Sequence, residues 1–267
     1  VGFVILAIIN HKLFKMKNTF LLLIFTCLLT TPGYSQDSKP LYVYNFYKVN
    51  PGHEESYENV VKTFVAGIQK KMIEEGCKDM WIFRKVDPTT EMSNYISHYT
   101  IDIYDEGQNT CDIDWITEAF PNLPEGLSEE LLKLHRNNRK RVYVARLGVV
   151  SSYNKEEKPA EFSIVNFMRV KNMEKYSKKH KESTKVIFEK YTPRQLWSAN
   201  NRLNLEGYGE EEWNYMTVDG YYSKEDAMKS QNVPQKEIVQ SNKKYGVNSE
   251  MRTINKRMLS NLIMYLK

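Results

Sequence analysis

The sequence has few of the features that mark the common enzyme classes. It holds three cysteines and five histidines, and none of their spacings resembles a zinc site. It contains no Gly-x-Gly-x-x-Gly, no phosphate-binding loop and no Gly-x-Ser-x-Gly. Nucleotide-dependent and serine-hydrolase activities are therefore unsupported, and we expect neither a metal nor a cofactor.

The sequence also lacks an apolar run long enough to span a membrane, which needs about 20 residues. The apolar stretch at 19–31 is shorter, and lysines precede it. Pro32 ends this stretch, and Gly33 and Ser35 are small residues placed for cleavage after Ser35. This layout is typical of a secretory signal peptide. We therefore expect residues 1–35 to be removed and the protein to be periplasmic or secreted; an uncleaved N-terminal anchor is the alternative.

A strong surplus of positive charge is missing once this leader is set aside. The whole chain carries a formal net charge of +5, and the leader supplies three of the lysines, so about +2 remains. The remaining charge does not indicate a basic patch for nucleic-acid binding. The expected partner is a small molecule, with no nucleic acid and no stable membrane span, and the protein is expected to be a monomer or a homodimer.

Only two cysteines remain after the predicted cleavage. Cys77 opens a predicted strand, and Cys111 follows the strand that should pair with it in a hairpin. The two ends can therefore meet, and exported proteins usually oxidise paired thiols. The sequence predicts a Cys77–Cys111 disulfide, with two buried free cysteines as the alternative.

The most informative pattern present is a repeat. Four landmarks recur in the same order after 116 to 121 residues, which indicates a duplicated domain. They are Asn45-Phe46-Tyr47-Lys48-Val49 with Asn166-Phe167-Met168-Arg169-Val170, Trp81 with Trp197, Tyr99-Thr100-Ile101-Asp102 with Met216-Thr217-Val218-Asp219, and Lys140-Arg141 with Lys256-Arg257.

Each half is expected to run strand, helix, strand, strand, helix, strand. Aromatic and β-branched runs predict strands at 41–49, 80–86, 95–104, 142–150, 162–170, 196–199, 213–222 and 259–266. Apolar residues three and four apart predict helices at 54–75, 114–119, 128–138, 173–190, 224–229 and 249–258. The polar segment 151–160 is interpreted as a linker between repeats at 36–150 and 161–267.

This order is the ferredoxin-like plan, an antiparallel sheet with helices on one face. The opening strand ends in Val-Asn-Pro-Gly-His (Val49 to His53) and leads into an amphipathic helix. In this the chain resembles the dimeric α/β-barrel superfamily, in its antibiotic-biosynthesis-monooxygenase and NIPSNAP-like branch. The resemblance implies an α+β fold, with two tandem ferredoxin-like repeats packed sheet to sheet as a single-chain α/β barrel. The second half departs from the pattern at Lys171-Asn172, where the Pro-Gly turn is missing.

The third strand of each half carries the catalytic candidates. Side chains alternate along a strand, so His98, Thr100 and Asp102 share one face, and Tyr215, Thr217 and Asp219 share its counterpart. We expect this polar face to line the barrel interior, with His98 as a general base and the two carboxylates as catalytic partners. His98 and Asp102 lie about 13 Å apart along the strand, so His98 would need a group such as Asp219 from the other half. A structural histidine is the alternative.

The ligand-binding candidates are the repeated polar and aromatic residues. They are Asn45, Trp81, Thr100, Asn166, Trp197, Tyr215 and Thr217. An asparagine inside a strand is disfavoured, so each amide either donates to a ligand or satisfies a loop or neighbouring strand. Each tryptophan either lines a flat apolar site or belongs to the core.

Three functions follow from these expectations. The first is an exported small-molecule-binding protein of unknown ligand with a partly aromatic barrel interior. The second is a cofactor-independent monooxygenase- or isomerase-type enzyme that uses His98 as its base. The third is a structural envelope protein with a filled interior. Only the first half has His98 and the cysteines, so a single functional site is expected on that side.

Overall fold

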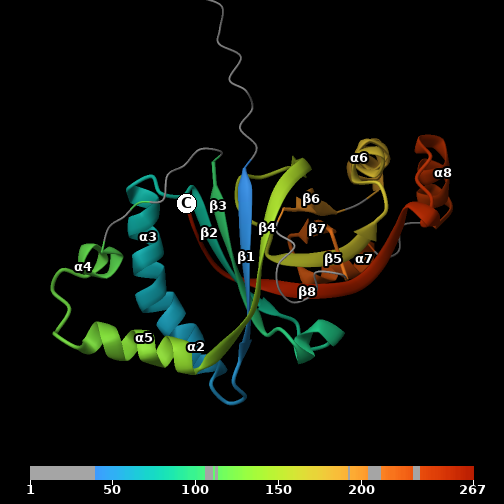
Figure 1. The fold of residues 1–267 in the computed structure, drawn as a ribbon. Coiled ribbons are helices and arrows are strands. Elements are labelled where there is room, and N and C mark those ends of the chain that lie inside the picture. Colours follow the sequence, from blue (N-terminus) through green and yellow to red (C-terminus); the bar gives the residue numbers. More distant parts are fainter. Residues whose placement is uncertain (1–39, 106–110, 112–113, 192, 204–211, 231–234) are drawn as a thin grey trace, which may run out of the picture. The chain divides into compact units, whose positions relative to one another are not determined.

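Eight antiparallel strands close into a barrel in the computed structural model (Figure 1), which describes residues 40–105, 111, 114–191, 193–203, 212–230 and 235–267. The strands follow one another around it in the order β1-β3-β2-β8-β5-β7-β6-β4. Their bounds are β1 Leu41–Val49, β2 Met80–Val86, β3 His98–Tyr104, β4 Arg139–Asn154, β5 Phe162–Val170, β6 Arg194–Arg202, β7 Tyr215–Tyr221 and β8 Arg252–Leu266.

The strand order is the same in the two halves of the chain. The first half contributes β4-β1-β3-β2 and the second β8-β5-β7-β6, and the pairs β2–β8 and β4–β6 join them. Asn45 lies opposite Thr100 in the first half, as Asn166 lies opposite Thr217 in the second. Sequence landmarks that recur along the chain therefore occupy matching places in the two sheets.

Helices cover the outside of this barrel. In Figure 1, the blue-to-green helices α2, α3 and α5 lie on one side and the yellow-to-red helices α6 and α8 on the other. Their bounds are α2 Glu54–Val60, α3 Ala66–Glu74, α4 Trp115–Ala119, α5 Leu127–Asn137, α6 Met173–Tyr191, α7 Lys224–Ser230 and α8 Gln235–Tyr245, with shorter helical segments η1 Val61–Val65, η2 Glu91–Asn94 and η3 Ser249–Met251. None of the helices among the described residues is long and apolar enough to cross a membrane.

The helix predicted at 54–75 is confirmed, with one local change. Segment η1 is π-helical and joins α2 to α3 without a break. A π turn inserts an extra residue into the helical repeat. It thereby changes which side chains of the segment face the sheet.

The helix predicted at 249–258 is wrong. Residues from Arg252 onward form β8, which pairs with β5 and then with β2, and the helix of this region lies earlier, at Gln235–Tyr245. The four-residue spacing of Ile254 and Met258 suits a helix, but the long-range pairing that closes the barrel overrides this local pattern. The same pairing extends β4 to Asn154, into the predicted linker.

The barrel interior is the main apolar core. Aromatic and branched side chains from both halves meet there, among them Phe46, Tyr99, Phe167, Val218 and Met258. Tyr99 and Ile101 thus face inward, and His98, Thr100 and Asp102 face the helices. The expectation that the polar face lines the interior is therefore wrong, because packing two sheets face to face requires their apolar sides to meet.

The predicted disulfide is confirmed. Cys77 precedes β2 and Cys111 follows β3, and the two bonded residues have Cα atoms 5.8 Å apart. Cys77 is buried, and the bond closes a sequence separation of 34 residues. It ties together the open ends of the β2–β3 hairpin. The signal peptide, whose segment lies outside the described residues, remains a prediction.

Replacing both cysteines should destabilise the protein measurably. Removing a cross-link restores conformational freedom to the unfolded chain, and a native disulfide typically contributes about 2–4 kcal/mol. We expect the Cys77→Ser/Cys111→Ser variant to lose stability of this order in a denaturant titration. The parent protein treated with reductant should match the variant; equal stability of the reduced and oxidised parent would contradict the prediction.

Candidate functional site

A half-buried amide, a buried carboxylate and a buried cation form one cluster on the outer face of the first sheet. The Asn45 amide donates to Asp102 Oδ2 at 3.0 Å. Lys78 forms an ion pair with Asp102 Oδ1 and also donates to Gln69 Oε1 at 2.7 Å. Lys78 is 3% exposed, and a buried ammonium needs such partners. The Asn45 amide therefore satisfies a neighbouring strand.

The second half repeats this cluster with different residues. The Asn166 amide donates to Asp219 Oδ2 and to Thr217 Oγ1, both at 3.2 Å. Arg194 pairs with Asp219 Oδ1 at 3.1 Å, and Arg257 donates to Asn166 Oδ1 at 2.9 Å. The two clusters lie at equivalent strand positions, with an arginine in place of Lys78.

His98 lies beneath helix α2 and pairs with a residue that the sequence reasoning missed. Its Nε2 is 3.2 Å from Glu58 Oε1, and its Nδ1 is 3.1 Å from Ser97 Oγ. The carboxylate beside His98 is thus Glu58, and Asp219 is held by Arg194 instead. Burial lowers the pKa of His98, and the bond to Glu58 opposes this only in part. Both ring nitrogens have partners, as in a structural histidine.

Glu58 is ionised in this environment. Burial raises the pKa of Glu58, but hydrogen bonds from Lys85 and His98 outweigh it and lower the pKa to about 2. Lys85 Nζ lies 2.7 Å from the same oxygen that His98 contacts. The sequence would have indicated Glu58 only if the face of β3 that carries His98 had been placed toward helix α2.

A cavity of about 250 Å³ lies between the first sheet and its helices. We call it the outer cavity. Four predicted site residues line it: Asn45, Trp81, Thr100 and Asp102. The other lining residues are Tyr47, Tyr57, Val61, Val65, Gln69, His135 and Arg139. Val61 and Val65 belong to the π-helical turn, so this irregular turn forms part of the wall.

Three lining residues, Tyr57, His135 and Arg139, form a group at the cavity. The rings of Tyr57 and His135 stack with centroids 5.4 Å apart, and Arg139 lies over the Tyr47 ring at 3.8 Å. Arg139 Nη2 is 2.9 Å from His135 Nε2. Burial, together with the charges of Arg139 and Arg136, lowers the pKa of His135 to about 3. His135 is therefore neutral at physiological pH.

Each member of this group has a buried polar atom without a protein partner. These atoms are Tyr57 Oη, His135 Nδ1 and Arg139 Nε. Buried polar atoms are nearly always hydrogen-bonded, so three such atoms on residues that line one cavity are unusual. Among the described carboxylates, none lies within salt-bridge distance of Arg139.

The corresponding tyrosine of the second half is satisfied internally. Arg252 Nη1 donates to Tyr176 Oη at 2.7 Å, and His180 stacks on Tyr176 with centroids 4.7 Å apart. Trp197 and Tyr215 pack in this apolar cluster, and Tyr215 Oη accepts from Ser177 Oγ at 3.2 Å. The predicted ligand-binding residues of this half thus pack against one another.

No family model and no curated protein matches the sequence. Among solved structures, the chain is similar to a "Putative monooxygenase" from Fusobacterium nucleatum, with 13% identity, a TM-score of 0.53, and 86% of this chain and 94% of that chain covered. A chlorite dismutase mutant from Candidatus Nitrospira defluvii matches at 10% identity and a TM-score of 0.49, covering 86% and 93%. A haem-binding protein from Thermus thermophilus matches at 11% identity and a TM-score of 0.46, with 85% of this chain and 92% of that chain covered. At 13% identity, the similarity to the Fusobacterium nucleatum protein shows the fold alone.

The outer cavity suits a small organic molecule better than a metal or a large cofactor. Among the residues that the structure describes, no group of three His, Cys, Asp or Glu side chains is placed to hold a metal ion. A volume of about 250 Å³ is below the roughly 300–1,000 Å³ of pockets for drug-sized ligands. A porphyrin macrocycle does not fit between these residues as they lie.

Acid should destabilise the fold through the buried histidine of the second half. Burial is the main reason that the pKa of His180 is lowered from 6.5 to about 3. Between pH 6.5 and pH 3 only the unfolded state binds a proton at His180. The stabilisation that depends on a neutral His180 is therefore fully present above pH 6.5 and is lost as the pH falls toward 3. The free energy of unfolding should fall by about 1.4 kcal/mol per pH unit from this group.

The His180→Gln variant tests this linkage. Denaturant titrations across pH 4 to 7 should give the variant a shallower dependence on pH than the parent, with parallel curves above pH 7. Identical slopes in the two proteins would contradict the assignment of a neutral, buried His180.

Proposed function

We propose that the protein binds a small organic molecule in the outer cavity of its first half. The observation that carries this proposal is that three residues lining one cavity, Tyr57, His135 and Arg139, each have a buried polar atom without a partner. A ligand that bonded to them would remove the cost of leaving buried polar groups unsatisfied, about 1–3 kcal/mol each. In the second half, Arg252 bonds the corresponding tyrosine hydroxyl.

The chemistry of the wall suggests the ligand class. Arg139 offers a guanidinium without a described carboxylate partner, which suits an anionic oxygen such as a carboxylate. Trp81, Val61 and Val65 offer apolar surface, and Tyr57 adds an aromatic edge. The best match is a flat, largely apolar molecule of one or two rings that carries a carboxylate.

Binding is better supported than acid–base catalysis. The histidine at the cavity, His135, has a pKa of about 3 and is a weak base at neutral pH. His98, the predicted base, is not among the lining residues and holds partners on both ring nitrogens. The Asp102 carboxylate is occupied by Lys78 and Asn45. The enzyme alternative is supported only by similarity in fold, which does not identify a substrate.

We further propose that the chain arose by tandem duplication and is exported. The matching strand orders and the paired positions of Asn45 with Asn166 support duplication. The predicted signal segment and the Cys77–Cys111 bond support an oxidising compartment. Because one chain closes the whole barrel, a monomer is sufficient for the site.

Removing the Arg139 guanidinium should weaken binding selectively. The probe is 2-naphthoate, measured by isothermal titration calorimetry. Loss of a charge-assisted hydrogen bond is worth about 1.5–3 kcal/mol, so Arg139→Gln should raise Kd by about tenfold or more. Lys140→Gln, which removes an exposed charge at the next residue, should leave Kd within about twofold of the parent.

Two results would overturn the proposal. One is an absence of 2-naphthoate binding up to millimolar concentration by the folded parent protein. The other is an equal loss of affinity in the Arg139→Gln and Lys140→Gln variants, since this would show attraction by net charge without a defined site.

A further inference from the structure

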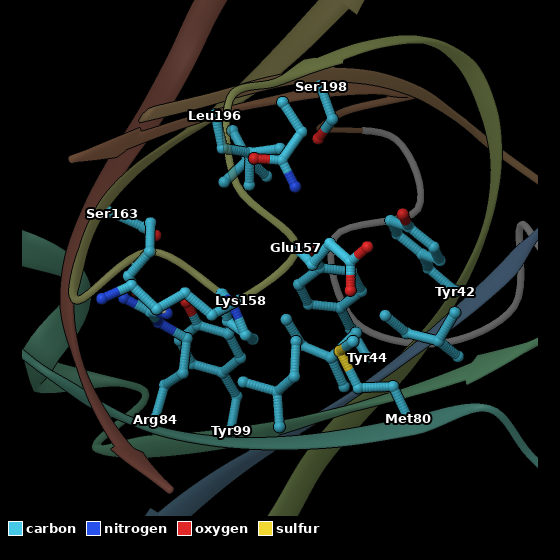
Figure 2. Close-up of a pocket in the computed structure, with 17 residues that line it drawn as sticks. Tyr42, Tyr44, Met80, Arg84, Tyr99, Glu157, Lys158, Ser163, Leu196 and Ser198 are labelled. Atoms are coloured by element: carbon cyan, nitrogen blue, oxygen red, sulfur yellow. The ribbon is translucent and has the colours of Figure 1, made fainter. Parts of the chain in front are cut away.

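A second cavity, of about 130 Å³, lies inside the barrel. We call it the inner cavity. Side chains of the first half, among them Tyr44, Ile82 and Ile101, line it together with Leu196 and Val218 of the second. Figure 2 shows Leu196 and Ser198 across the pocket from Arg84 and Tyr99. It is distinct from the outer cavity, because the two line opposite faces of the first sheet.

An arginine is buried at this inner cavity without an anion. Arg84 is 3% exposed, and its guanidinium donates to four neutral acceptors. These are Ala160 O at 2.7 Å, Glu161 O at 3.2 Å, Ser260 O at 3.2 Å and Ser260 Oγ at 3.1 Å. None of the carboxylates that the structure describes lies within salt-bridge distance of it.

This leaves a positive charge that only neutral groups surround. The Tyr99 hydroxyl is a further hydrogen-bond partner of the Arg84 guanidinium. A buried charge without a counter-charge is costly even when it is hydrogen-bonded. An anion in the inner cavity would supply the missing charge.

Tyrosines add neutral donors beside Arg84. Tyr42, Tyr44 and Tyr99 all line the inner cavity. Tyr99 Oη lies 2.6 Å from Ser260 Oγ, an acceptor of Arg84. Burial raises the pKa of Tyr44 well above its ordinary value. Its hydroxyl is therefore protonated at neutral pH and can donate to an anionic oxygen.

The remaining wall is apolar and the space is small. Ile82, Ile101, Val218 and Leu196 face it, together with Met80. A dry protein cavity of roughly 150 Å³ holds one benzene molecule. The occupant is therefore limited to about one ring.

We propose that the inner cavity is a second ligand site, which binds a one-ring aromatic carboxylate with its anion at Arg84. Glu157 and Lys158 lie at its exposed rim, where they pair with Lys267 and Glu156. Both pairs are exposed to solvent, which leaves Arg84 as the buried cation of the site.

Benzoate, with benzyl alcohol as its neutral analogue, tests this site by isothermal titration calorimetry. We expect the Arg139→Gln variant, whose outer cavity lacks the guanidinium, to bind benzoate at least about tenfold more tightly than benzyl alcohol, because only benzoate supplies a charge for Arg84. Equal affinity, or no benzoate binding up to millimolar concentration, would overturn the proposal. This comparison leaves Arg84 in place, so it does not depend on whether an Arg84 substitution folds.

Substitution at Ser163 tests the location. Ser163 lies on β5 and lines the inner cavity (Figure 2). Ser163→Leu should fill the space and weaken benzoate binding at least about tenfold, whereas Ser163→Ala should keep it within about twofold. Both Ser163 variants are made in the Arg139→Gln background, because the Arg139 guanidinium of the outer cavity also attracts carboxylates. Unaltered benzoate binding in Ser163→Leu on this background would contradict the inner site.

Discussion

The closure of the barrel is the constraint on which the rest of the structure depends. Pairing β2 with β8 and β4 with β6 joins the two sheets, and their inward faces then share one apolar core. Strand residues alternate between faces, so Thr100 and Asp102 face the helices together with His98. Their buried polar groups therefore need partners in the outer layer, between sheet and helix.

The repeated amide–carboxylate–cation cluster answers that need. Asp102 and Asp219 are both nearly buried, and a lone buried carboxylate would be strongly disfavoured. A strand asparagine and a cation satisfy each of them: Asn45 and Lys78 in one half, Asn166 and Arg194 in the other. Removing one member would leave its partner buried and uncompensated, a larger loss than the pair's net stabilisation. The clusters thus hold the strands in one register beneath the helices.

Sequence patterns were sufficient for most of the strands and helices and for part of the site. Alternation and amphipathic spacing gave the elements up to about residue 230, and the placement of Cys77 and Cys111 gave the disulfide. The start of β8 was missed, because its pairing with distant strands is invisible to local spacing. The inward or outward choice for Thr100 and Asp102 was also missed, since alternation fixes which residues share a face and not where that face points. Glu58, His135 and Arg139 lie on other elements and join the site only after folding.

The two halves differ at their outer faces. In the second half Arg252 closes on Tyr176, whereas in the first Arg139, His135 and Tyr57 keep unpartnered atoms around a cavity. The account's central claim is that this difference makes the first half the ligand-binding half. A crystal structure of the protein grown with 2-naphthoate tests it most directly. The account predicts the ring against Trp81 with its carboxylate at Arg139; a naphthoate bound in the second half, or an outer cavity without ligand, would contradict it.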